Sequence, residues 1–198
     1  MSLRKLLILD IDHTLICSQL KSPNPSPHDF EIERYYVNKR PYLDTFLDWC
    51  FKTFDVGIWT AANEEYATGI LLNILREQHK PIFVYTEKEC GTERMIIRKG
   101  NKRTRYDVTI KNIEKVRWKE WNGRKYQVRD ILIVDDTPDT FMWNPGNGIE
   151  VKGFYGDSTD DELIYLRKYL ESLLHEVEVH RIDKTKWRKK IEENTLKA

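Results

Sequence analysis

LLILDIDHTL, at residues 6–15, is the stretch that decides the fold of this chain. Four apolar residues are followed directly by two aspartates one residue apart, Asp10 and Asp12. A short apolar run is typical of a parallel strand buried on both faces, and open α/β sheets bind ligands at the carboxyl ends of such strands. Two like charges this close cost free energy unless a cation or a reaction needs them. The alternative is an ordinary aspartate turn after the strand, capped by Thr14.

A second acidic pair repeats the pattern near the C-terminal end of the chain. ILIVDDTP, residues 131–138, contains four β-prone apolar residues, then Asp135 and Asp136, then a Thr-Pro that ends the strand. Two such strands bring four carboxylates to one edge of a sheet. Oxygen ligands of this type suit Mg²⁺, which usually takes one or two carboxylates and keeps several waters.

A third β-prone run, DVGIWTAAN at residues 55–63, ends in a hydroxyl residue, Thr60. This hydroxyl and the neighbouring backbone N–H groups could bind an anion where the next helix begins. The alternative is that Thr60 is a plain helix N-cap, a role for which Asn63 competes.

These strand ends resemble the haloacid-dehalogenase-like superfamily of phosphotransferases. The motifs that support the resemblance are Asp10-Ile11-Asp12-His13-Thr14, Trp59-Thr60-Ala61 and Asp135-Asp136. The similarity is closest to the NLI-interacting-factor-like branch, the phosphatases of the C-terminal tail of RNA polymerase II, and it adds Lys39-Arg40-Pro41 and residues 63–67. Two positions depart from that branch. His13 stands where an acidic residue or glycine is usual, and Asp136 stands where asparagine is frequent.

The resemblance implies catalytic roles for the first motif and a metal ion beside it. Asp10 would be the nucleophile that forms an aspartyl-phosphate, and Asp12 the general acid and base. Mg²⁺ would be held by Asp10, the main-chain carbonyl of Asp12, and the carboxylates of Asp135 and Asp136. Within the resembled superfamily, an acid at position 12 implies a phosphatase or phosphomutase rather than an ion pump or a dehalogenase.

The same resemblance implies a hydroxyl and a lysine that bind the equatorial phosphoryl oxygens. Thr60 fits the first role. Lys111, which precedes the second acidic pair by a helix-sized segment, fits the second role best, with Lys115 as the alternative.

The spacing of these motifs limits what can cover the site. Only 45 positions separate Thr14 from Thr60, and 50 separate Thr60 from Lys111. Neither gap has room for a large cap domain, since domains seldom fall below ~50 residues. In the resembled branch an open site goes with macromolecular substrates, so we expect a phosphorylated protein carrying phosphoserine or phosphothreonine. A phosphatase of nucleic-acid ends or nucleotides and an inactive phospho-binding module are the alternatives, although the complete set of motif residues argues against the module.

Charge is unevenly distributed although the net charge is only +1. Six of the twelve residues from 94 to 105 are arginine or lysine. This basic stretch contains a Gly-Asn pair, which predicts a hairpin or loop. It could bind a polyanion, either nucleic acid or a multiply phosphorylated protein. A solvated basic loop with no ligand is the alternative.

The pattern of elements predicts an α/β fold: a three-layer, Rossmann-like, mostly parallel sheet with a small β-hairpin insert and no large cap domain. Residues 1–178 are expected to form the phosphatase domain and residues 179–198 a charged tail or peripheral helix. Strands are predicted at 4–9, 55–59, 81–85, 131–134 and 149–151, with an exposed strand or hairpin at 30–37. Helices are predicted at 41–52, 64–76, 113–121, 160–174 (capped by Ser158 or Thr159) and 184–196, and the proline-rich residues 21–27 are expected to be irregular.

Composition agrees with a small intracellular enzyme. The 198 residues are 40% hydrophobic and 12% aromatic, which is ample for a core. Three cysteines form no Cys-x-x-Cys pair and indicate a reducing compartment, nuclear or cytoplasmic. No segment approaches the ~20 apolar residues of a membrane span, so no membrane partner is expected.

Overall fold

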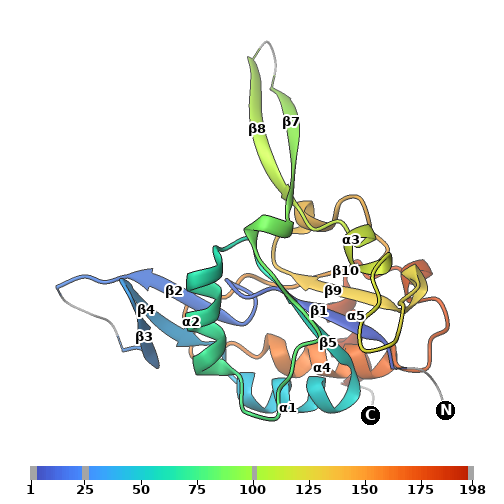
Figure 1. The fold of residues 1–198 in the computed structure, drawn as a ribbon, viewed down its shortest axis with the longest axis horizontal. Coiled ribbons are helices and arrows are strands. Elements are labelled where there is room, and N and C mark those ends of the chain that lie inside the picture. The colour runs from blue at the N-terminus through green and yellow to red at the C-terminus, as the bar shows by residue number, and fades with distance from the viewer. Residues whose placement is uncertain (1–3, 24–26, 100–101, 196–198) are drawn as a thin grey trace.

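The computed structural model of the protein describes residues 4–23, 27–99 and 102–195. Its central sheet has five parallel strands (Figure 1). The strand order is β10-β9-β1-β5-β6. The strands are β1 (Leu6–Leu9), β5 (Asp55–Trp59), β6 (Val84–Tyr85), β9 (Ile131–Asp135) and β10 (Gly148–Glu150). β1 pairs with β5 on one side and with β9 on the other, so the three predicted motif strands are neighbours.

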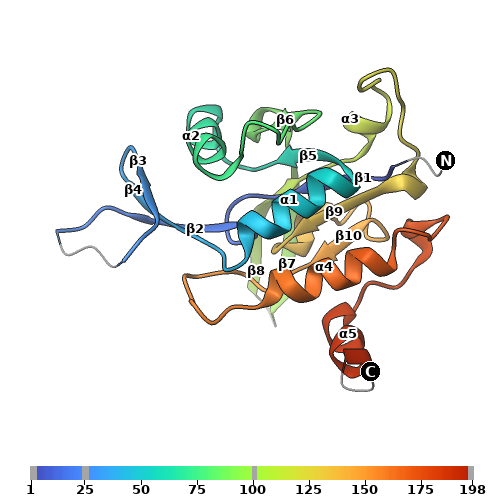
Figure 2. The same ribbon diagram turned by 90° about the horizontal axis from the view of Figure 1, so that it is seen from below.

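Both faces of this sheet are covered, which explains why β1 is apolar at every position. Leu7 and Leu9 face a core built with α1 (Leu43–Thr53), α2 (Glu64–Ile74) and α4 (Glu162–Ser172). Leu6 and Ile8 face a second core with α3 (Glu114–Arg117) and the short helix η3 (Pro138–Phe141). Figure 2 shows α1 and α4 running side by side along the sheet. The three-layer, mostly parallel α/β prediction is confirmed.

Two small antiparallel sheets project from this body (Figure 1). The first has the order β2-β4-β3 and follows the first motif, with β2 at Ile16–Leu20, β3 at Phe30–Ile32 and β4 at Tyr35–Lys39. The second is a hairpin of β7 (Gly91–Lys99) and β8 (Lys102–Ile110). The basic stretch therefore forms a hairpin, which is one of the two forms predicted for it. Within the described residues, neither insert is a large cap domain.

Several predicted elements differ from the observed ones. The predicted helix 113–121 is wrong beyond its first turn, because α3 ends at Arg117 and Trp121 instead bridges Arg124 around a turn in which Asn122 and Gly123 both have positive φ. The predicted strand 81–85 is only two residues long. Residues 30–37 form a hairpin of β3 and β4, which is one of the two predicted forms, but β2 was not predicted. The other strands and helices lie within three residues of their predicted bounds, and part of the proline-rich prediction, residues 24–26, lies outside the described residues.

The start of α4 corrects a predicted cap. Asp161 occupies the N-cap position without a side-chain cap bond, whereas Asp160 Oδ1 accepts a hydrogen bond from the Glu162 N–H at 3.1 Å. The Thr159 hydroxyl donates to Asp157 at 2.7 Å, and Thr159 lies two residues before the N-cap position. The prediction of Ser158 or Thr159 as cap is therefore wrong, because the neighbouring carboxylates take that function.

The C-terminal segment contains a helix, α5 (Trp187–Thr195). Trp187 is buried, and its indole N–H donates to the carbonyl of Glu150 at 2.7 Å. Arg188 forms ion pairs with Asp161 and Glu162, both at 2.8 Å. The division at residue 178 stays a prediction, but α5 packs on the same core as the sheet. No helix in the described part of the chain is long and apolar enough to cross a lipid bilayer.

Candidate active site

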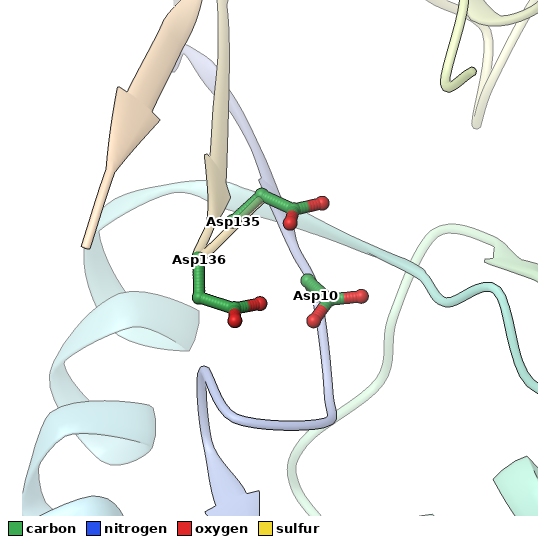
Figure 3. A group of neighbouring side chains, drawn as sticks. All are labelled: Asp10, Asp135 and Asp136. Atoms are coloured by element: carbon green, nitrogen blue, oxygen red, sulfur yellow. The ribbon is translucent and has the colours of Figure 1, made fainter. Parts of the chain in front are cut away.

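Three carboxylates converge where β1 and β9 end (Figure 3). Asp10 follows β1 directly, Asp135 is the last residue of β9, and Asp136 follows it. Each of the three offers a carboxylate oxygen, and these oxygens lie within 4.8 Å of one another. The Asp10 N–H donates to the carbonyl of Val134 at 3.0 Å, so the parallel pairing itself sets the spacing of this cluster.

Lys111 lies between two of these carboxylates. Its Nζ donates to Asp10 Oδ1 at 2.5 Å and to Asp135 Oδ2 at 2.6 Å, and the residue is 1% exposed. Its main-chain N–H donates to the carbonyl of Thr140 at 2.6 Å, which holds the end of β8 against η3. Lys115 points elsewhere, because its Nζ donates to the carbonyl of Glu89 at 2.8 Å. Of the two lysine candidates, only Lys111 lies at the carboxylate cluster.

The two acids of the second pair differ in what they already bind. Asp135 accepts hydrogen bonds from Lys111, from the Thr140 hydroxyl at 2.8 Å and from the Thr137 N–H at 2.9 Å. Asp136 is half-buried, and no other residue in the described ranges donates a hydrogen bond to its carboxylate. Asp135 is therefore committed to the protein, whereas Asp136 has free lone pairs beside Asp10.

Burial makes negative charge costly at this cluster. Loss of solvent, reinforced by Asp135, raises the pKa of Asp10 to about 8, although Lys111 acts in the opposite direction. Burial and the neighbouring Asp135 also raise the pKa of Asp136. Burial alone would lower the pKa of Lys111, but the carboxylates of Asp10 and Asp135 raise it above its ordinary value. A further cation bound here would relieve the repulsion among the acids, because bound ions dominate the local electrostatics of a site.

Asp12 lies beside the cluster and has partners that sequence reasoning missed. The hydroxyl of Tyr66, in α2, donates to Asp12 Oδ1 at 2.5 Å. Ser18, in β2, lies 3.5 Å from the same oxygen, and its Oγ lies 2.8 Å from the Tyr66 hydroxyl, whose one proton goes to Asp12. Burial raises the pKa of Asp12, and the bond from Tyr66 partly offsets that rise. Tyr66 belongs to residues 63–67, which only the family resemblance singles out, so no local sequence signal predicts this contact.

Thr60 lies at the end of β5, next to β1, and is 1% exposed. Its Oγ1 accepts from the Ala62 N–H at 3.1 Å. The N-cap of α2 is Asn63, whose Oδ1 accepts from the Tyr66 N–H at 2.9 Å, so Thr60 is not the helix cap. No described residue accepts the hydroxyl proton of Thr60, which leaves that proton available to an anion.

Arg40 holds the loop that carries the first motif. Its guanidinium is fully buried and binds both oxygens of Asp160, at 2.8 and 2.9 Å. It also donates to the main-chain carbonyl of Thr14 at 3.0 Å. His13, the unusual residue of the motif, adopts a positive φ of 58° and contacts the carbonyl of Phe154 through Nδ1 at 3.0 Å. The loop between β1 and β2 is thus tied to the segment that precedes α4.

Comparison with known proteins gives a consistent family. The family model described as NLI interacting factor-like phosphatase matches residues 5–181. Nuclear envelope morphology protein 1 of Saccharomyces cerevisiae is 30% identical over 195 residues, which are 90% of this chain and 41% of that protein. A CTD phosphatase-like protein of Invertebrate iridescent virus 6 is 30% identical over 86% of this chain and 100% of its own length.

A solved structure has a similar fold. Fission yeast Fcp1, an RNA polymerase II CTD phosphatase bound to beryllium fluoride, matches with a TM-score of 0.50 and 15% identity over 96% of this chain. The present chain spans 62% of the Fcp1 chain and less than half of the yeast envelope protein. The family that the motifs predicted is confirmed by the match over residues 5–181: the chain belongs to the NLI interacting factor-like phosphatases.

Proposed function

We propose that this chain is a Mg²⁺-dependent phosphomonoester hydrolase that works through an aspartyl-phosphate on Asp10. The observation that supports this most strongly is the buried contact of Lys111 with Asp10 and Asp135, next to the uncommitted Asp136. A buried carboxylate held beside a lysine and further acids is suited to attack phosphorus while positive charge neutralises the phosphoryl oxygens.

The chemistry needs two steps. In the first, an Asp10 oxygen bonds to phosphorus, the bond to the leaving oxygen breaks, and Asp12 gives its proton to that oxygen. In the second, Asp12 takes a proton from water, whose oxygen attacks phosphorus, so that inorganic phosphate leaves and Asp10 is regenerated. Thr60 and Lys111 bind the equatorial oxygens in both steps.

The donor set fits Mg²⁺. Hard oxygen ligands are present, and the free oxygens belong to Asp10 and Asp136, with the main-chain carbonyl of Asp12 as a further donor. Asp135 instead orients Lys111, because both of its carboxylate oxygens already accept hydrogen bonds, from the Thr137 N–H and from Lys111 and the Thr140 hydroxyl. A bound Mg²⁺ would supply charge neutralisation between nucleophile and phosphate.

The proposed substrate is phosphoserine or phosphothreonine in a protein. A hollow of about 380 Å³ opens beside Asp12 and Tyr66 and is also lined by Tyr35 of β4 and by Arg34 in the turn before it. Relatives named as CTD phosphatases support a phosphoprotein, and the name of the yeast relative supports a nuclear or cytoplasmic location. The positive charge of the β7–β8 hairpin is the observation behind a second candidate, a phosphatase of nucleic-acid ends.

A substrate panel with and without metal tests the function. We expect phosphate release from phosphoserine and phosphothreonine peptides with Mg²⁺, and at least tenfold lower kcat/KM for 3′- or 5′-phosphorylated oligonucleotides and sugar phosphates. Chelator should abolish the activity, and Mg²⁺ should restore it much better than Ca²⁺, whose coordination is larger and looser. Full activity in excess chelator would contradict the proposed Mg²⁺ dependence. A preference for oligonucleotides would show that nucleic-acid ends, and not phosphopeptides, are the substrate.

The contact between Tyr66 and Asp12 predicts a distinctive loss. Tyr66→Phe should lower kcat for a phosphoserine peptide by about tenfold and affect an activated aryl phosphate much less, because only the alkyl leaving group needs a proton from a well-placed acid. Asp12→Asn should show the same pattern with larger losses. Tyr36→Phe is the control, since Tyr36 lies opposite Gln19 rather than Ser18, and its ring packs at a tilt against His28. Equal losses on both substrates would contradict a role of Tyr66 in positioning Asp12 as the general acid.

A further inference from the structure

The hairpin of β7 and β8 stands out from the body without a third strand (Figure 1). Its nine paired positions run from Gly91–Ile110 to Lys99–Lys102. A two-stranded hairpin is marginal in water unless something packs on it. Only its base is covered, where Val108 and Ile110 are buried against η3. The outer part is thus a surface with no partner inside the described chain.

The register separates the hairpin into two unlike faces. Directly opposed residues share a face, and side chains alternate along each strand. One face, called here the arginine face, contains Arg94, Ile96, Arg103, Arg105 and Asp107, all of them exposed. Arg98 takes the register position opposite Arg103. The other face contains Val108, Ile110 and the half-buried Met95 and Tyr106.

Only part of the charge on the arginine face is neutralised. Arg94 pairs with Asp107 at 2.9 Å. Arg103 and Arg105 form no ion pair with any residue in the described ranges. Two exposed guanidinium groups two residues apart therefore lack an anion, and guanidinium is the side chain best suited to bind phosphate oxygens through two parallel hydrogen bonds.

At the base of the hairpin, the start of β7 and the end of β8 both lie next to the residues proposed to bind phosphate. Lys111 follows β8 directly and contacts Asp10. At the other end, the thiol of Cys90 lies 3.7 Å from the carbonyl of Thr60. At ~3.3 Å per residue, Arg105 and Arg103 lie about 20–26 Å along the strand from Lys111. An extended peptide covers that distance in roughly six to eight residues.

We propose that the arginine face binds a second phosphate of a multiply phosphorylated peptide, six to eight residues from the phosphoserine or phosphothreonine held at Asp10. This inference rests on the proposed function and specifies its substrate class. The unpaired arginines provide the affinity, and the pairing of β7 with β8, continued directly into Lys111, sets the spacing. The enzyme then acts faster on densely phosphorylated segments than on isolated sites.

The chemistry of the arginine face favours a phosphopeptide over single-stranded nucleic acid. Proteins that bind single strands place aromatic rings beside their basic groups so that bases can stack on them. The aromatic residue of this part of the hairpin, Tyr106, belongs to the opposite face. The arginine face has guanidinium groups and one exposed aliphatic side chain, Ile96, but no stacking surface.

Paired phosphopeptides test the proposal with the full chain. The first carries one phosphoserine, and others carry a second phosphoserine two, seven or fourteen residues away, on either side. We expect about tenfold lower KM only for the peptide with a spacing of seven, on at least one side, with kcat unchanged. The double variant Arg103→Gln/Arg105→Gln should lose this preference and keep full activity on a small aryl phosphate. Arg103→Lys/Arg105→Lys should lose most of it, because lysine cannot bind in the same paired geometry.

A charge-matched control removes two exposed cations elsewhere. Arg181→Gln/Lys189→Gln, at side chains that are both 72% exposed, should retain the spacing preference. Equal KM for all peptides, or a preference that survives in the hairpin variant, would overturn the proposal. An oligonucleotide without terminal phosphates serves as a further probe. If it inhibits the parent but not the hairpin variant, and no peptide shows a spacing preference, the arginine face binds nucleic acid instead. Absence of turnover on the aryl phosphate would contradict the proposed function itself.

Discussion

Asp10→Asn is expected to lower turnover of a chromogenic aryl phosphate by at least about 10³-fold, because the variant has an amide in place of the attacking carboxylate. The substitution keeps the size of the side chain, and the residue is buried with its N–H bonded to Val134, so the fold should persist. Steady-state kinetics with Mg²⁺ in excess measures the loss. Asp139→Asn, which changes an acid of η3 outside the carboxylate cluster, is the matched control and should retain activity. Near-parental turnover by the Asp10 variant would end the proposed mechanism.

The same variant has a pH signature in the metal-free protein. Burial raises the pKa of Asp10 from 3.8 to about 8, so the native state holds a proton there that the unfolded chain has lost. Stability therefore falls as pH rises from about 4 to 8 and levels off above that range. Asparagine does not titrate, so Asp10→Asn should become more stable relative to the parent as pH increases. Denaturant unfolding in chelator at pH 5, 6.5 and 8 measures the difference, and a difference independent of pH would contradict this environment for Asp10.

Arg40→Leu is expected to destabilise the protein by about 3–5 kcal/mol, because it leaves the buried carboxylate of Asp160 without its partner. It also removes the donor to the carbonyl of Thr14, in the loop that follows Asp12. Loss of activity at temperatures where the variant is still folded is expected for the same reason. The free energy of unfolding from urea titration measures the effect.

Two further variants distinguish the loss of the buried ion pair between Arg40 and Asp160 from the removal of a charge in general. Arg40→Leu/Asp160→Leu should be less destabilised than the sum of the two single variants, since no unpaired charge remains buried. Arg76→Leu removes an exposed partner of Asp48, with the arginine side chain 47% exposed, and should change stability by less than about 1 kcal/mol. Additive losses in the Arg40 and Asp160 double variant would show that the pair is not coupled.

The residues proposed for the catalytic centre were predictable because they follow strands that are recognisable locally. The apolar runs before Asp10, Thr60 and Asp135 are short, uninterrupted and β-prone, and parallel strands end at a common edge. Lys111 was predicted through the family resemblance, with Lys115 as the alternative, and the structure places it between Asp10 and Asp135. The absence of room for a large cap domain followed from counting residues between motifs.

Tertiary structure alone decided how that centre is supported. Tyr66 meets Asp12 across 54 positions, and Arg40 meets Asp160 across 120. Such contacts leave no periodic trace in the sequence, because they depend on how α2 and the start of α4 pack against the sheet. Helix α3 ended early for a related reason, since Trp121 turned back to pack on Phe83 at a ring-centroid distance of 4.7 Å. The sequence by itself determined which strands carry the chemistry and where they end. Packing between distant segments determined which acid of the second pair stays free and what holds Asp12.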